Sequence, residues 1–160
     1  MRLSLLVGVS AALFVWLTSA GLPSNVASHF NAAGVADGFM SRGAYLAVVL
    51  GVVAATPLLS ALLGRWVSGL PDESINLPNK EHWLSAQHRE ASLAYVAAWL
   101  VWSGAAVAAL LSFVHWQVVA ANARVPPSLD ERSLWLGLAV ALATLIIGLI
   151  ALFRRFGRVT

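Results

Sequence analysis

The chain alternates between long apolar runs and short polar segments. Four runs are apolar on every helical face, and they cover about residues 3–22, 44–66, 92–119 and 134–153. A transmembrane helix needs about 20 mainly apolar residues, and each run reaches that length. The pattern predicts an all-α integral membrane protein. We expect one multi-pass domain over residues 1–160, with four spans joined by segments 23–42, 67–91 and 120–133.

The first apolar run has an alternative interpretation as a secretory signal peptide. Thr18, Ser19 and Ala20 resemble the small-residue site at which such peptides are cleaved. The apolar stretch is longer than the usual signal core of roughly 7–15 residues. We therefore expect residues 3–22 to be a retained span.

Composition and charge fit the membrane class. Hydrophobic residues make up 59% of the chain and charged residues 11%, and cysteine is absent, which excludes disulfides and thiolate chemistry. The net charge is +3, but the basic residues flank the spans, so nucleic acid is not an expected partner and the lipid bilayer is. Cations predominate on one side of the four-span arrangement, so we expect both termini and the 67–91 segment to be cytoplasmic. Arg2, Arg65, Lys80, Arg89, Arg154, Arg155 and Arg158 fall on that side, and Arg42, Arg124 and Arg132 on the other.

The 23–42 segment is the part of the sequence that bilayer burial does not explain. Glycine and asparagine tolerate positive φ, and Asn, Asp and Gly favour turns, so an ordered outer loop is expected. Its polar side chains either hold the loop in shape through local hydrogen bonds or line a site for a ligand, peptide or ion. The candidate residues are His29, Asn31, Gly34, Asp37 and Gly38.

One histidine of the third span, His115, is expected at the same outer side. His29, Asp37 and His115 together would be a sufficient ligand set for a divalent ion. Their spacing matches no metal motif, so no metal or other cofactor is expected and these three are weak candidates. No nucleophile elbow or phosphate-binding glycine loop is present in the sequence, and no catalytic residue is proposed.

The 67–91 segment contains the second polar feature. We predict a short interfacial helix over residues 80–90, capped by Asn79, with Trp83 and Leu84 toward lipid and Lys80 and Arg89 near headgroups. The alternative is a docking surface for a cytoplasmic partner formed by Asn79, Lys80, Trp83 and Arg89. Within the spans, Trp99 and Trp102 share a helical face and are expected to pack against a neighbouring helix, and Pro57 is expected to kink the second span.

The motif His29-Phe30-Asn31, followed by Gly34, Asp37 and Gly38, resembles the signature of a bacterial membrane family known as domain of unknown function 1648. The same domain forms the N-terminal part of SdpI-type immunity proteins. The segment from Asn76 to Leu84 resembles short members of the family, so the likeness spans the first three helices. Two departures are Ala27, where a proline is common, and Phe39, where tryptophan is usual.

The resemblance implies a protein of the bacterial cytoplasmic membrane whose best-understood relatives protect against a secreted peptide toxin and signal to a regulator. The leading hypothesis is a non-enzymatic protein that binds a ligand or partner through the outer loop, in a sensing, immunity or envelope role. The first alternative is a structural subunit or assembly factor of a larger membrane complex. The second is a metal-dependent membrane enzyme that uses His29, Asp37 and His115.

Overall fold

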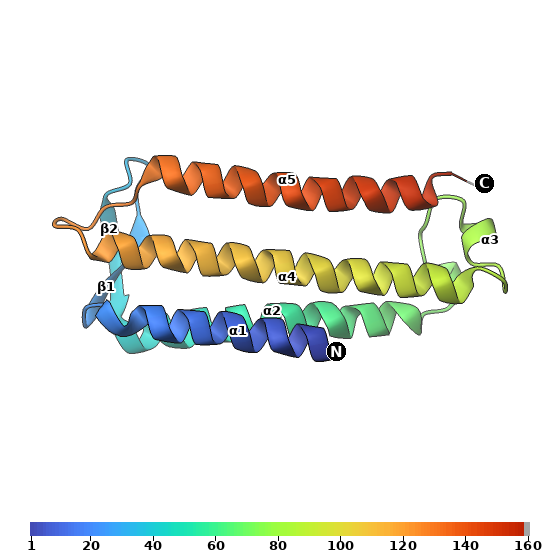
Figure 1. The fold of residues 1–160 in the computed structure, drawn as a ribbon, viewed down its shortest axis with the longest axis horizontal. Coiled ribbons are helices and arrows are strands. Elements are labelled where there is room, and N and C mark those ends of the chain that lie inside the picture. The colour runs from blue at the N-terminus through green and yellow to red at the C-terminus, as the bar shows by residue number, and fades with distance from the viewer. Residues whose placement is uncertain (159–160) are drawn as a thin grey trace.

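Four long helices dominate the computed structural model, which describes residues 1–158 (Figure 1). They are α1 (Arg2–Thr18), α2 (Arg42–Ser68), α4 (Arg89–Asn122) and α5 (Glu131–Phe156). All four are long and apolar enough to cross a membrane. The four predicted spans are therefore confirmed as helices. α1 ends at Thr18, before its apolar run does, whereas α2, α4 and α5 extend by two or three residues beyond theirs.

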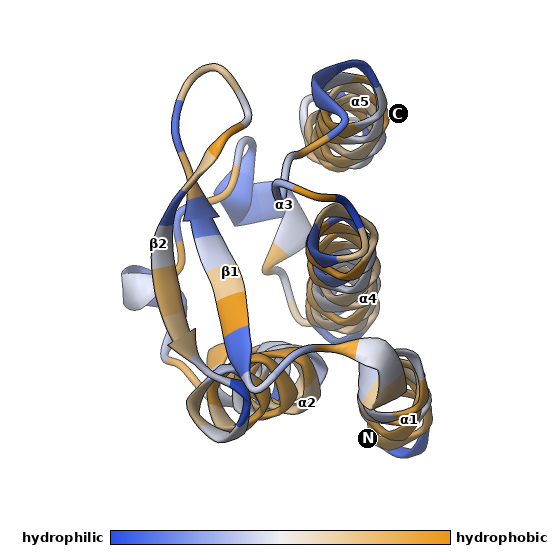
Figure 2. Cartoon of the chain, turned by 90° about the vertical axis from the view of Figure 1, so that its left-hand side faces the viewer, coloured by the Kyte–Doolittle hydropathy of each residue, from blue (hydrophilic) through white to orange (hydrophobic). Residues whose placement is uncertain are grey.

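The helices pack as a three-helix group with a fourth alongside. α1, α2 and α4 contact one another, whereas α5 packs along α4 (Figure 2). Small residues allow the close approaches: a Cβ added to Gly8 of α1 would lie 3.1 Å from the Ala54 carbonyl oxygen, and one added to Gly64 of α2 would lie 3.1 Å from the Ala97 Cα. At these two points the helices meet through glycine and alanine rather than through large side chains.

The predicted packing of the two deep tryptophans is confirmed at the α4–α5 contact. Trp99 donates from its indole Nε1 to the Gly148 carbonyl oxygen at 2.9 Å. The Trp102 ring lies where a Gly148 side chain would stand. α5 is therefore fixed to α4 by an indole hydrogen bond as well as by packing.

Proline 57 lies buried inside α2, where its ring faces Gly8 and its backbone faces Gly104. A proline removes the hydrogen bond to the carbonyl four residues earlier. The neighbouring hydroxyls do not bond that freed carbonyl. Thr56 donates to the Val52 carbonyl and Ser60 to the Thr56 carbonyl.

A β-hairpin joins α1 to α2, and the sequence patterns did not predict it. After a short 3₁₀ turn, η1 (Ser19–Gly21), strands β1 (Asn25–Phe30) and β2 (Ala36–Ser41) pair antiparallel. The Ser41 hydroxyl then accepts a hydrogen bond from Ala44 N at 3.2 Å and caps α2. Seen along the helices, the hairpin extends from α2 toward α5 at one end of the bundle (Figure 2).

The opposite end holds the segment between α2 and α4, where two expectations were wrong. It contains η2 (Asp72–Ser74) and α3 (Lys80–Trp83), and α3 is a single turn instead of a helix over residues 80–90. Trp83 and Leu84 are buried, not turned toward lipid. Leu84 packs with Ile75 and Leu93 in a small apolar core that folds the segment onto the start of α4.

Candidate functional site

The hairpin is irregular around His29. Ala27 pairs with Phe39, His29 with Gly38 and Phe30 with Ala36, so the register shifts on both sides of His29. Each shift adds one residue to one strand, which is a β-bulge. Bulges bend a strand and redirect its side chains, and they are common beside functional sites.

Asn31 shapes the turn between the strands. Its side-chain oxygen accepts hydrogen bonds from Ala33 N at 3.0 Å and Val35 N at 3.1 Å. Its backbone amide donates to the Val35 carbonyl, and its own carbonyl accepts from Gly34 N, each at 2.9 Å. The acceptor side of this amide is thus fully used in holding the turn, which is a role in architecture.

The two glycines of the motif are explained by backbone geometry. Gly34 has a φ of +68°, in the left-handed region that favours glycine. A Cβ on Gly34 would also lie 3.2 Å from the Glu131 side chain. A Cβ on Gly38 would lie 2.8 Å from the His29 Cβ, so only glycine lets the strand pass beneath this histidine.

The hairpin is fixed to the helices by a paired amide and by an apolar core. Asn122, at the end of α4, accepts from Ala27 N at 2.9 Å and donates to the Ala27 carbonyl at 3.0 Å, as a neighbouring strand would. Val26 is buried in a cluster with Leu22, Tyr45 and Val118. The hairpin is therefore a rigid platform on α2 and α4.

The hairpin tip is also bonded to the segment between α4 and α5. Ala36 N donates to the Pro127 carbonyl at 3.3 Å, Leu129 N donates to the Gly34 carbonyl at 2.8 Å, and Val35 forms a β-bridge with Ser128. Two segments about ninety residues apart in sequence thus form one surface.

His115 lies below the hairpin but does not join it. Its side chain is buried, and its two ring nitrogens hydrogen-bond the Thr18 and Tyr45 hydroxyls, each at 2.9 Å. The ring also stacks on Tyr45, with 5.8 Å between the centroids. His115 therefore ties α1, α2 and α4 together, and its two partners were missed because no sequence pattern marks them.

The weak metal set is not brought together. Within residues 1–158, no group of three His, Cys, Asp or Glu side chains is placed to hold a metal ion. His115 is 1% exposed and satisfied by hydroxyls, whereas His29 and Asp37 lie on the hairpin surface. The structure therefore corrects the grouping of His29, Asp37 and His115.

His29 and Asp37 form an exposed pair of their own. His29 Nδ1 lies 2.5 Å from Asp37 Oδ1, and the exposed fractions of the two side chains are 75% and 43%. The bulge at Asp37 turns its carboxylate toward the imidazole. This pair leaves the imidazole Nε2 and the second carboxylate oxygen available to another molecule.

The hairpin lies within a stretch that matches a known family. Residues 5–54 match the family described as Domain of unknown function (DUF1648). The match confirms the predicted resemblance over α1, the hairpin and the first half of α2. We refer to residues 5–54 as the DUF1648 segment. No curated protein and no solved structure matches the chain.

The inner candidates lie outside the DUF1648 segment, and their side chains contact the chain itself. Trp83 Nε1 and Asn79 Nδ2 both donate to the Phe156 carbonyl, at 3.0 and 2.9 Å. Asn79 does not cap α3 with its side chain, and its φ of 51° is left-handed. Arg155 lies over the Trp83 ring, with 4.1 Å from its guanidinium carbon to the centroid. These contacts attach the end of α5 to α3.

The two inner cations have similar internal partners. Arg89 Nε donates to Asp72 Oδ1 at 2.8 Å and its Nη2 donates to the Leu70 carbonyl at 3.0 Å. Lys80 Nζ lies 3.4 Å from the Glu73 carbonyl oxygen. The two Arg89 bonds hold the 69–88 segment against the start of α4, and the Lys80 contact joins two parts of that segment.

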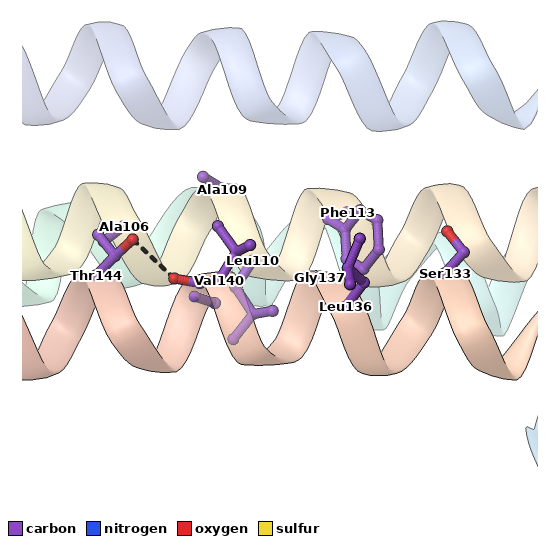
Figure 3. Close-up of a pocket in the computed structure, with 10 residues that line it drawn as sticks. Ala106, Ala109, Leu110, Phe113, Ser133, Leu136, Gly137, Val140 and Thr144 are labelled. Atoms are coloured by element: carbon purple, nitrogen blue, oxygen red, sulfur yellow. Dashed lines mark hydrogen bonds between the residues drawn. The ribbon is translucent and has the colours of Figure 1, made fainter.

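A crevice of about 440 Å³ lies between α4 and α5, outside the DUF1648 segment (Figure 3). Its walls are small or apolar, among them Ala106, Phe113 and Gly137. The Thr144 hydroxyl on its wall donates to the Val140 carbonyl of its own helix. With no ionisable side chain in its lining, the crevice offers no acid–base or ligating group, so the hairpin is the better candidate site.

Proposed function

We propose that the hairpin is an extracytoplasmic recognition surface that binds a secreted peptide or a comparable partner without catalysing a reaction. The observation that carries this proposal is the exposed His29–Asp37 pair. The other polar or glycine residues of the motif are accounted for by the turn, by positive φ or by close packing, whereas this pair supports none of those features. A polar pair that a rigid scaffold presents to solvent is typical of binding.

Apolar side chains on the same hairpin support a peptide as the ligand class. Phe39 is 52% exposed and Met40 is 37% exposed. Aromatic residues and methionine are enriched in protein interfaces, where they anchor a partner beside polar contacts. The fixed hairpin would also lose little conformational freedom on binding, which favours affinity.

The distribution of charge supports an orientation of the protein in the membrane. Seven of the ten lysines and arginines lie on the side of α3 and three on the side of the hairpin. The positive-inside rule then puts the hairpin outside the bacterial cytoplasmic membrane and both chain ends in the cytoplasm. A sensing, immunity or envelope role of the SdpI type agrees with this arrangement.

Native mass spectrometry of the protein extracted gently from its own membranes tests the proposal. We expect a bound peptide or small molecule on the wild type, and its loss on His29→Ala, because a central polar contact contributes about 1–2 kcal/mol, or roughly tenfold in affinity. Asn25→Ala is the matched control, since Asn25 is exposed on β1 and its side chain makes no hydrogen bond within residues 1–158.

Membrane abundance of each variant separates binding from folding. The proposal requires His29→Ala to insert at the wild-type level. Loss of the protein from the membrane would give His29 a structural role instead. A stable complex with other subunits that His29→Ala leaves intact would support the structural-subunit hypothesis and contradict this one.

A further inference from the structure

The face of α5 turned away from α4 presents apolar side chains at its C-terminal end. Ile146 is 45% exposed, Ile150 47% and Phe153 57%. These residues follow one another at intervals of three and four, so they form one stripe along the helix. On a helix that crosses a membrane, this stripe faces lipid chains.

A groove of about 360 Å³ runs along this stripe and ends at two arginines. Arg154 and Arg158 line it together with Ile146, Ile150 and Phe153. At a rise of 1.5 Å per residue, Ile146 lies about 15 Å along the helix axis from Phe156, the last residue of α5. That length is close to half of the roughly 30 Å hydrocarbon core, which is one leaflet.

The two arginines are available to bind an anion. Neither Arg154 nor Arg158 has a carboxylate within 4.0 Å among residues 1–158. Their neighbour Arg155 differs, because its guanidinium lies against the Trp83 ring. Arg154 lies in the last turn of α5 and Arg158 just beyond the helix end, and both line the groove, so their guanidinium groups can reach the same headgroup.

We propose that this groove binds an anionic phospholipid. Arg154 and Arg158 contact the phosphate and the negative headgroup, while one acyl chain lies along Phe153, Ile150 and Ile146. Charge selects the ligand: guanidinium groups bind phosphate in a two-pronged geometry, and a zwitterionic headgroup adds a cation that two arginines disfavour. The site lies at the opposite end of the bundle from the hairpin, so it stands apart from the recognition proposal.

Lipid retention measured by native mass spectrometry tests the site. The whole protein is reconstituted in vesicles of equimolar phosphatidylglycerol and phosphatidylcholine and then released into a mild detergent. We expect the wild type to retain phosphatidylglycerol in preference to phosphatidylcholine. The double variant Arg154→Gln with Arg158→Gln should lower that preference by roughly fivefold or more, since it removes both cations that line the groove and a single cation contributes about that factor.

Arg132→Gln is the matched control, because Arg132 is exposed in the first turn of the same helix. It should leave the preference at the wild-type value, and all three proteins should show the same helical content. Equal retention of the two lipids by the wild type would overturn the proposal. An unchanged preference in the double variant, or an equal loss in Arg132→Gln, would also overturn it. Retention of a second copy of the chain in place of lipid would overturn the proposal too.

Discussion

Asn122 bonds the hairpin to the end of α4, and replacing it by alanine tests how the hairpin is held. The Asn122 amide bonds both backbone groups of Ala27, at 2.9 and 3.0 Å, and also donates to the Val118 carbonyl of its own helix at 2.9 Å. Ala27 is fully buried. Asn122→Ala therefore leaves a buried donor and a buried acceptor without their partner while removing little apolar contact.

The expected cost follows from that count. A buried polar group left without a partner costs about 1–3 kcal/mol, so two such groups should lower the free energy of opening the hairpin by about 2–6 kcal/mol. A water molecule that enters the vacated space would bring the loss toward the lower value. Each 1.4 kcal/mol is tenfold in an equilibrium constant, so hydrogen exchange at the hairpin should accelerate at least about thirtyfold.

Hydrogen exchange with mass-spectrometric readout measures this acceleration in peptides that cover residues 25–41. The amides of α2 and α4 should keep their protection, because the lost bonds join the hairpin to α4 and not the helices to each other. Exchange in Asn122→Ala that equals that of the wild type would refute the reasoning. Equal acceleration in the exposed-residue variant Asn25→Ala would refute it as well.

Two other substitutions probe the site and its support. Gly38→Ala places a Cβ 2.8 Å from that of His29, so the strand must shift, and the thermal midpoint in detergent should fall by the equivalent of about 1–3 kcal/mol. Tyr45→Phe removes the hydroxyl that hydrogen-bonds Nδ1 of buried His115 and leaves that nitrogen unpaired. The same thermal midpoint should fall by the equivalent of about 1–3 kcal/mol of unfolding free energy.

Each of these has a matched control in the chain. Gly43→Ala adds the same methyl group at a position with nothing within 4 Å, so its thermal midpoint should equal that of the wild type or rise slightly. Tyr95→Phe removes a hydroxyl for which no hydrogen bond occurs within residues 1–158. A variant that unfolds at the same temperature as its control would show that the contact in question contributes nothing.

The spans could be predicted because bilayer burial acts on local composition. About 20 apolar residues suffice to identify a helix that can cross a membrane, whatever its neighbours are. The turn at residues 31–35 was also foreseeable in part, since asparagine and glycine favour such turns, and Gly34 does adopt positive φ.

The hairpin and the segment that contains α3 depend on partners distant in sequence. Ala27 meets Asn122 across 95 positions, and Asn79 reaches the Phe156 carbonyl across 77. The side chain of Asn79 does not cap α3, because a capping residue has an extended backbone whereas Asn79 is left-handed, and its Nδ2 donates to the distant Phe156 carbonyl. His29 and Asp37 could be singled out from the motif, but their pairing depends on two bulges that the sequence does not reveal.

The bonds from the hairpin tip to residues 127–129 link this surface to the synthesis of the chain. α5 is made after the hairpin and α4, and the residues just before it supply the Pro127 carbonyl and the Leu129 amide to the tip. A chain that has been made only as far as α4 lacks these two bonds. The hairpin tip therefore reaches its final structure about ninety residues of synthesis after the hairpin itself has been made.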